Sequence, residues 1–184
     1  MGEVENELSR PVAVGELPPE GERVEIVAEP GECEALAKRL GIVGLTSLTA
    51  VLVVAPAAIG EGAVRVTGEF RAHIAERCVV SLDVFETDIT EPVEALFVRG
   101  AESLDHADEA FDAEDEVIEP LEGETIDAGE LVVEHLAVAL DPYPRGPGVP
   151  AEAVTYSVGP DGARAEIETE KGPFAALGEL RRKM

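Results

Sequence analysis

The sequence has no tryptophan, only two tyrosines and five phenylalanines, and only two cysteines. Two cysteines, Cys33 and Cys78, are too few for the disulfide framework of a small secreted protein. Bases are scarce as well: 14 lysines and arginines stand against 39 aspartates and glutamates, which gives a formal net charge of −25. A domain that binds nucleic acid normally gathers bases on one face and often adds aromatic side chains. We therefore expect the body of this protein not to bind RNA directly.

Long apolar runs are also missing. No stretch approaches the roughly 18 apolar residues of a membrane-spanning helix, and the start, MGEVENELSRP, lacks the basic and apolar parts of a secretory signal. We expect a soluble, cytoplasmic protein without membrane contact, in which both cysteines are buried thiols. The strong negative charge favours a basic partner protein, although it can also serve solubility alone.

Periodicity predicts an α+β fold for residues 1–148, with a mainly antiparallel sheet, two or three short helices packed on it, and an acidic loop. Residues 64–74 alternate between apolar even positions and polar odd positions, which is the period of a half-buried strand. Gly68 falls on the apolar side, where a missing side chain indicates a bulge or the close approach of another backbone. The strand is expected to continue to about residue 80 and to return through residues 87–98.

The segment PGECEALAKRLG, residues 30–41, is the first predicted helix. Pro30 suits a first helical turn, and Gly41 offers a left-handed cap at the end. Cys33 is expected to face the core from this helix. Short strands are expected before it, at residues 12–14 and 23–28.

The second predicted helix lies in IDAGELVVEHLAVALDPYPRGPG, residues 126–148, and ends where Pro142 disfavours a helical conformation of the preceding residue. An acidic stripe follows one side of this helix at offsets of three, four and seven: Asp127, Glu130, Glu134 and Asp141. Asp127 is also suited to cap the helix, with Glu130 at the third position of a capping box. The stripe is a candidate partner-binding surface, because neighbouring acids repel each other until an opposite charge approaches. The alternative is that it is simply the solvated side of the helix.

Residues 102–126 are rich in Glu and Asp, contain no Lys or Arg and show no sustained period, so we expect a mobile acidic loop inside the domain. Residues 149–184 are expected to form a C-terminal extension. Its end, KGPFAALGELRRKM, predicts a short basic helix in which Phe174, Leu177 and Leu180 share one edge. This end can fold back onto the acidic domain or bind a partner, and it alone has a charge suited to RNA.

The 126–148 segment, taken with GEFRAHIAERCVVSLDVFE at residues 68–86, resembles the YceD family of large ribosomal RNA subunit accumulation proteins. The resemblance lies in Ile126 with Asp127, Glu134, Leu136 with Leu140, and Pro142 with Pro144. Two positions depart from the family pattern. Ala128 stands where Leu is usual, and Ser81 stands where many members carry the second cysteine of a turn that begins at Cys78.

Metal and catalytic sites are not expected. A zinc site needs four sulfur or imidazole ligands within tetrahedral reach, and the cysteines and histidines of this chain show no such spacing. His73 and Cys78 fall on opposite faces of one strand, which argues against a base and nucleophile pair. No glycine-rich phosphate loop is present. We therefore expect a non-enzymatic protein without cofactor or metal.

The resemblance implies a factor in large ribosomal subunit biogenesis that helps ribosomal RNA accumulate. The acidic body favours a basic ribosomal protein or an assembly intermediate as the partner, with RNA contact limited to the C-terminal end. The alternative is a protein that binds a small apolar ligand in a cavity lined by the apolar face of the sheet. The candidate partner-binding residues are Asp127, Glu130, Glu134, Asp141, Pro142, Pro144, Phe174, Leu177, Arg181 and Arg182.

Overall fold

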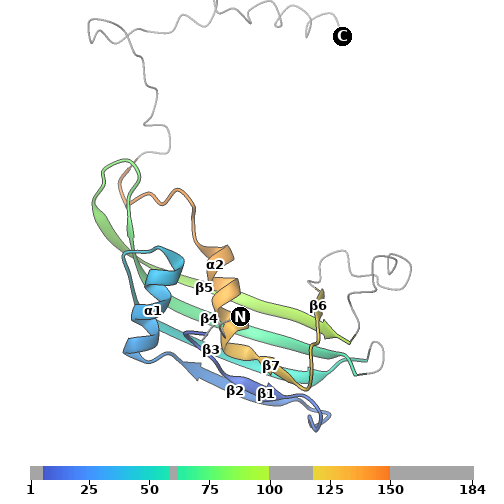
Figure 1. Ribbon diagram of the computed structural model, residues 1–184. Helices are drawn as coiled ribbons and strands as arrows, with labels where there is room; N and C mark the ends of the chain where they lie inside the picture. The colour runs from blue at the N-terminus through green and yellow to red at the C-terminus, as the bar shows by residue number, and fades with distance from the viewer. Residues whose placement is uncertain (1–5, 59–61, 100–117, 150–184) are drawn as a thin grey trace, which may run out of the picture. The chain divides into compact units, whose positions relative to one another are not determined.

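A computed structural model describes residues 6–58, 62–99 and 118–149 (Figure 1). The chain divides into two units, Met1–Gly148 and Val149–Met184, and nearly all described residues lie in the first. The elements in chain order are β1 (Pro11–Ala13), β2 (Glu22–Val27), α1 (Pro30–Leu40), β3 (Gly44–Pro56), β4 (Val64–Arg77), β5 (Val84–Val98), β6 (Ile118–Pro120), β7 (Thr125–Asp127) and α2 (Ala128–Ala139).

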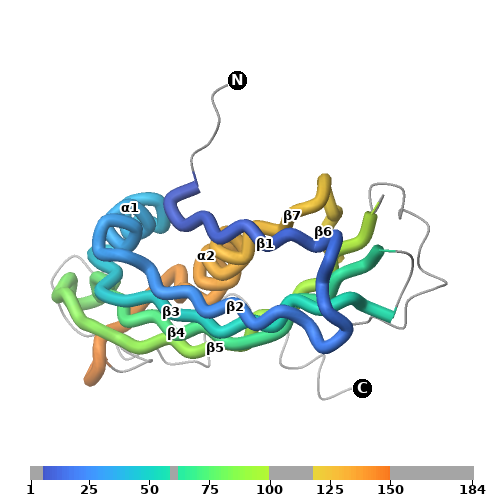
Figure 2. Tube along the Cα trace, turned by 90° about the horizontal axis from the view of Figure 1, so that it is seen from below, coloured from blue at the N-terminus to red at the C-terminus, as the bar shows by residue number. Residues whose placement is uncertain are grey.

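The main sheet has five strands in the order β2-β3-β4-β5-β6, and β1 pairs with β7 in a separate two-stranded sheet. The strands from β2 to β5 are antiparallel neighbours. β6 lies parallel to the last part of β5, at Leu96–Val98. Figure 2 shows two layers, with the five-stranded sheet on one side and α1, α2 and the β1–β7 pair on the other. The predicted α+β fold is therefore confirmed.

The core lies between these two layers. Phe70 and Ile74, at even positions of β4, are fully buried, as are Leu36 of α1 and Leu136 of α2. Side chains alternate across a strand, so the even positions of β4 all point to the layer that carries the helices. The apolar stripes of α1 and α2 cover this face, because each helix must bury its own apolar side.

Helix α1 forms where the sequence predicts it. Its backbone begins at Pro30, and the N–H of Glu29 donates to the Glu32 carboxylate at 2.7 Å. Its end is capped by Gly41, which adopts the left-handed conformation with φ of 70°. Cys33 is buried, as expected.

Gly68 marks a close approach of two backbones. A Cβ atom at this position would lie 2.2 Å from the carbonyl oxygen of Val51, on the neighbouring strand β3. The pairing of β3 with β4 runs through Gly68 and Leu52 without a shift, and its irregularity lies at Leu45 and Ser47 instead. Of the two predicted reasons for this glycine, the close approach is confirmed and the bulge is wrong.

The predicted acidic loop is wrong over its last part, residues 118–126. These residues form β6, a turn and the start of β7, and they bury Leu121 and Ile126. The acidic composition did not reveal these strands, because their pairing partners, β5 and β1, lie far away in the sequence. Residues 102–117 lie outside the described residues. So do the C-terminal candidates Phe174, Leu177, Arg181 and Arg182.

The hairpin between β4 and β5 is placed slightly differently from the prediction. β4 ends at Arg77 and β5 already begins at Val84, whereas the alternation predicted a strand to about residue 80. Leu82 has a positive φ of 65° in the turn between them. The turn therefore has about the predicted length, but it lies at residues 78–83 instead of 81–86, and β5 is longer than the periodicity indicated.

Replacing Gly68 with alanine should lower the free energy of unfolding by about 3 kcal/mol, because the new methyl group would overlap the Val51 carbonyl. Chemical denaturation of both proteins measures this difference. Gly44→Ala in β3 is the matched control, since its Cβ atom would lie at an ordinary 3.7 Å from the Cβ of Ala75. Equal stability of the two variants would contradict the close approach.

Candidate functional site

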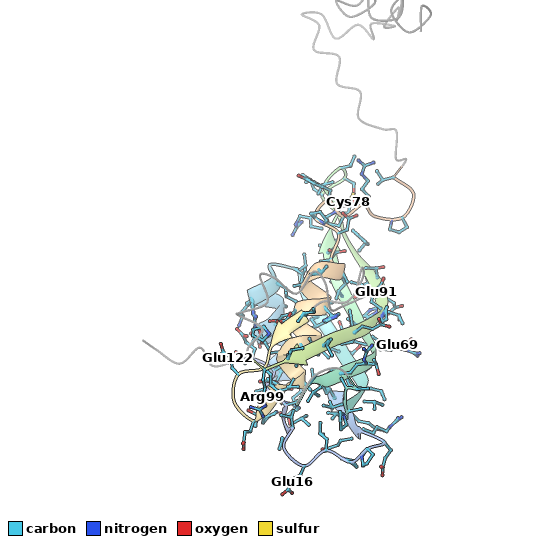
Figure 3. The ribbon with its side chains drawn as sticks, turned by 90° about the vertical axis from the view of Figure 1, so that its right-hand side faces the viewer. Glu16, Glu69, Cys78, Glu91, Arg99 and Glu122 are labelled. Atoms are coloured by element: carbon cyan, nitrogen blue, oxygen red, sulfur yellow. The ribbon has the colours of Figure 1, made fainter. Side chains whose placement is uncertain are left out.

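Two adjoining hollows follow α2 where it faces β5 and β6. The first has a volume of about 390 Å³ and is lined by Glu91, Pro92, Glu119, Glu134, His135, Val138 and Ala139. The second has a volume of about 370 Å³, extends toward β7, and shares Glu119 and Glu134 with the first. We call the two hollows together the acidic groove. Figure 3 shows Glu91 on β5 at one side of the molecule.

Asp127 fixes the start of α2 and thereby one wall of the groove. Its carboxylate accepts hydrogen bonds from the backbone N–H of Gly129 at 3.0 Å, of Glu130 at 3.2 Å and of Arg10 at 2.8 Å. Burial alone would raise the pKa of Asp127, but hydrogen bonds from the backbone of Arg10 and Glu130 and from the side chains of Ser9 and Asn6 together outweigh it and hold the pKa below its usual value. The predicted helix cap is confirmed, whereas the side chain of Glu130 does not complete a capping box.

Glu130 points instead to α1. Both carboxylate oxygens accept hydrogen bonds from the guanidinium of Arg39, one of them at 2.9 Å, and Arg39 also contacts Glu7 at 3.0 Å. These hydrogen bonds to Glu130 and Glu7 raise the pKa of Arg39. The charge of Glu130 is therefore compensated within the protein, and its ion pair joins α2 to α1 and to the N-terminal segment.

Glu134 lies one turn further along α2 and faces the groove. Its pKa is raised, first by burial of the carboxyl group and then by the negative charges of Glu119 and Glu130. In the described part of the chain, four of the six acids that line the groove form no ion pair with a lysine or arginine: Glu91, Glu119, Glu134 and, in the second hollow, Glu122. The other two are the helix cap Asp127 and Glu130, the partner of Arg39. The groove thus concentrates negative charge that the fold itself does not compensate.

Apolar side chains also line the groove beside these acids. Val138, on α2, is 88% exposed, and Pro92 and Ala139 lie near it in the first hollow. His135 is held by a hydrogen bond from Nδ1–H to the backbone carbonyl of Leu131 at 2.9 Å. Exposed apolar side chains next to acids are suited to a ligand that carries both apolar groups and positive charge.

The chain after α2 packs against the β4–β5 turn. Asp141 accepts a hydrogen bond from the N–H of Tyr143 at 2.8 Å, and the carbonyl of Pro144 accepts one from Val79 at 2.9 Å. Pro142 is exposed between them. The proline-rich exit therefore supports the turn that contains Cys78, which Figure 3 shows far from Glu16.

The structure divides the acidic stripe that the sequence predicts. Asp127 caps α2, Glu130 pairs with Arg39, and Asp141 lies beyond the helix in a turn of its own. Of these four stripe residues, only Glu134 has an unpaired carboxylate that lines the first hollow of the groove. The stripe is therefore not one continuous surface, because a helix cap and an ion pair to α1 use two of its members.

Sequence reasoning missed the acids that face Glu134 across the groove. Glu119 lies in the acid-rich stretch, where no local signal separated it from its neighbours. Glu91 was detectable, since it stands among the apolar odd positions Ile89, Val93 and Ala95, where an acid is unusual. Its register with Phe70 in the structure places it on the core side of the sheet.

Cys78 and His73 do not form a reactive pair. The Cys78 sulfur is buried and accepts a hydrogen bond from the N–H of Ser81 at 3.4 Å. Hydrogen bonds from Ser81 and from backbone groups lower the pKa of Cys78 to about 6. The His73 ring lies on the other face, 2.7 Å from Asp88 through Nδ1. The residues that the structure describes include no cluster of three or more potential metal ligands.

The pattern of the family described as large ribosomal RNA subunit accumulation protein YceD matches residues 66–181. The chain belongs to the YceD family. The match begins in β4 and includes β5, β6 and α2, so both walls of the acidic groove lie within it. The YceD name implies a role in the accumulation of large-subunit ribosomal RNA, and it names no catalytic activity.

Searches of curated proteins and of solved structures give no match to this YceD-family chain. Neither helix that the structure describes has the length and apolar character needed to cross a membrane.

Glu76 is a buried acid outside the groove. It is only 7% exposed, on the core side of β4, and its pKa is raised first by burial and then by the nearby charge of Asp141. In the sequence, the even position of Glu76 in the alternating strand indicates that it lies on the core side.

Glu76→Gln should stabilise the protein near pH 7 by about 1 kcal/mol, since an ionised carboxyl would no longer be buried. Because the pKa is raised in the folded state, ionisation destabilises the fold as pH rises above the ordinary value of 4.5. The gain should therefore disappear near pH 4, where the carboxyl is protonated in both states. Thermal melts at both pH values measure this gain in stability. Glu94→Gln, on the exposed face of β5, is the control variant, because it changes an acid that is not buried. A gain that persists at low pH would contradict this explanation.

Proposed function

We propose that this protein is a non-enzymatic factor in large ribosomal subunit biogenesis that binds a basic ribosomal protein. The partner is either free or presented by an assembly intermediate, and it binds in the acidic groove. The observation that supports this proposal is the cluster of unpaired acids, Glu91, Glu119 and Glu134, beside exposed apolar side chains.

The charge of the groove favours a cationic ligand. Glu119 raises the pKa of Glu134, which means that the two carboxylates repel each other at neutral pH. A lysine or arginine placed between them relieves this repulsion, whereas a phosphate adds to it. The proposed partner therefore offers cationic side chains rather than a nucleic-acid backbone to the groove.

The apolar side chains that line the groove define the partner further. Lysine and arginine carry long aliphatic stems that pack on apolar surface while their charged ends reach carboxylates. Val138 and Pro92 supply such a surface next to Glu91 and Glu134. Burial of the stems contributes about 25 cal/mol per Å² of apolar surface, so binding does not depend on charge alone.

A small ligand is the second candidate. The first hollow, at about 390 Å³, falls within the size range of small-molecule sites. The apolar face of the sheet is filled by side chains from α1 and α2 in the described residues, so such a ligand would have to occupy the groove instead. The acids around the groove then require a ligand with a positive charge.

Replacing Glu91, Glu119 and Glu134 together with glutamine should reduce the affinity for the ribosomal protein partner on the order of tenfold, because the groove loses its negative charge. The partner is identified first, by pull-down from cell extract at low and high salt, where capture should fall as salt rises. Its dissociation constant is then measured for the variant and the unchanged protein.

The matched control is the triple variant of Glu16, Glu20 and Glu22. These are exposed acids of the β1–β2 connection and of β2, so the control removes the same number of charges elsewhere. If both variants lose the same affinity for the partner, the effect comes from the overall charge of the protein and not from the groove. If no ribosomal protein or precursor particle is captured even at low salt, the proposal is wrong.

A further inference from the structure

One side of β5 is largely free. β5 pairs with β4 along its length, from Val84 to Phe97, whereas β6 pairs with its other side only at Leu96–Val98. Among the described residues, the backbone between Val84 and Ala95 has no strand partner on that side. The same edge of β5 thus binds one strand, β6, and then continues unpaired.

The direction of the free backbone groups follows from β6. The carbonyl of Val98 accepts a hydrogen bond from the N–H of Leu121 at 3.0 Å, so the backbone groups of Val98 point away from β4. Backbone groups alternate between the two sides of a strand, and the register of β4 with β5 has no shift. Glu86, Asp88 and Thr90 therefore direct their N–H and C=O groups to the free side.

Pro92 has the same orientation but carries no N–H. A proline is tolerated here because its missing donor faces away from the ladder with β4. Pro92 interrupts the row of N–H donors on the free side of β5. A hydrogen-bond ladder between β5 and an added strand that begins at Val84 would therefore end at Thr90. This leaves residues 84–90 as a free edge with a defined length.

The side chains of this free edge alternate in chemistry. Phe85, Thr87 and Ile89 lie on the core side of the sheet and are partly exposed. On the opposite face, the side chains of Glu86 and Asp88 are 67% and 82% exposed. His73 contacts both carboxylates, at 3.5 Å and 2.7 Å. The two nearest arginines of β4 on this face have other partners, since Arg71 pairs with Glu69 and Arg77 donates to the carbonyl of Leu82. Among the described residues, Glu86 and Asp88 therefore contact an imidazole but no lysine or arginine.

We propose that the free edge of β5, residues 84–90, binds an extended segment of the basic partner as an added strand. Side chains of a paired strand follow the alternation of their neighbours. The bound segment therefore presents apolar side chains beside Phe85 and Ile89, and lysine or arginine beside Glu86 and Asp88. The inference rests on the proposed function and adds the mode of binding.

The acids explain the choice of partner over self-association. An open edge strand is a site for pairing with any other strand, and charged side chains on it discourage pairing with a second copy. Two copies of β5 would bring Glu86 and Asp88 of each chain together. A basic strand meets no such repulsion, so the same residues exclude self-pairing and favour the proposed partner.

The test uses the full chain and two synthetic peptides, KVKTKVKTK and the same peptide with N-methyl groups on the backbone nitrogens of its fourth and fifth residues. Both carry the same side chains, but neighbouring residues of a strand direct their N–H groups to opposite sides, so the two N-methyl groups block pairing along either edge of the second peptide. The first peptide should bind at least about tenfold more tightly, as measured by calorimetry. Hydrogen exchange should slow at the amides of Glu86 and Asp88 when it is bound.

Thr90→Pro should weaken binding of KVKTKVKTK about tenfold relative to Thr90→Ala. Proline removes a donor from the free edge without removing one from the ladder with β4, since the N–H of Thr90 points away from β4. Thermal melts check that both variants fold. If Thr90→Pro does not fold, the test rests on whether hydrogen exchange at Glu86 and Asp88 of the unchanged protein slows when the peptide binds.

Equal affinity for the two peptides, or exchange that slows in the acidic groove but not at Glu86 and Asp88, would overturn the added strand. So would slow exchange at these amides in the free protein, because the edge would then be occupied by another segment of the chain. The proposed function survives either result if the groove variant still loses its ribosomal protein. It fails separately if no ribosomal protein is captured.

Discussion

The carboxylate of Asp127 is the contact on which the arrangement of this domain depends most. It accepts hydrogen bonds from two N–H groups at the start of α2 and from the N–H of Arg10 just before β1. A helix leaves its first N–H groups without partners, and an ionised cap at this end is also favoured by the helix dipole. One side chain thereby fixes where α2 begins and joins it to the N-terminal segment. Glu134 lies opposite Glu119 because α2 starts at this point and runs in this direction.

Two of the few bases of the body hold elements together. Arg39 joins α1 to Glu130 and Glu7, and Arg10 makes two hydrogen bonds of 2.9 Å to Glu32 of α1. Charge-assisted pairs of this kind also specify orientation, since the planar guanidinium contacts a carboxylate through two parallel bonds. With these bases engaged, the acids of the groove remain uncompensated. Acids without a lysine or arginine partner therefore lie beside α2 and along β5.

The acidic groove and the free edge of β5 are neighbouring parts of one side of the fold. β5 contributes Glu91 and Pro92 to the groove and residues 84–90 to the free edge. Pro92 separates them, because it ends the row of backbone donors where the groove begins. Both parts lie within the residues that match the YceD family, whereas β1, β2 and α1 precede the match. A long basic segment that pairs with the edge can therefore continue into the groove without leaving this side of the protein.

The sequence alone determined the features that depend on neighbouring residues. The alternation in β4, the left-handed cap at Gly41 and the helix cap at Asp127 each follow from the conformational preference of a few residues. The family was also recognisable from local motifs, notably the helix that starts at Ile126 and its proline-rich exit. Only the tertiary structure decided that Glu130 pairs with Arg39 and that Glu119 faces Glu134. These contacts join residues far apart in the chain, and periodicity states which side of an element is buried but not which distant element covers it.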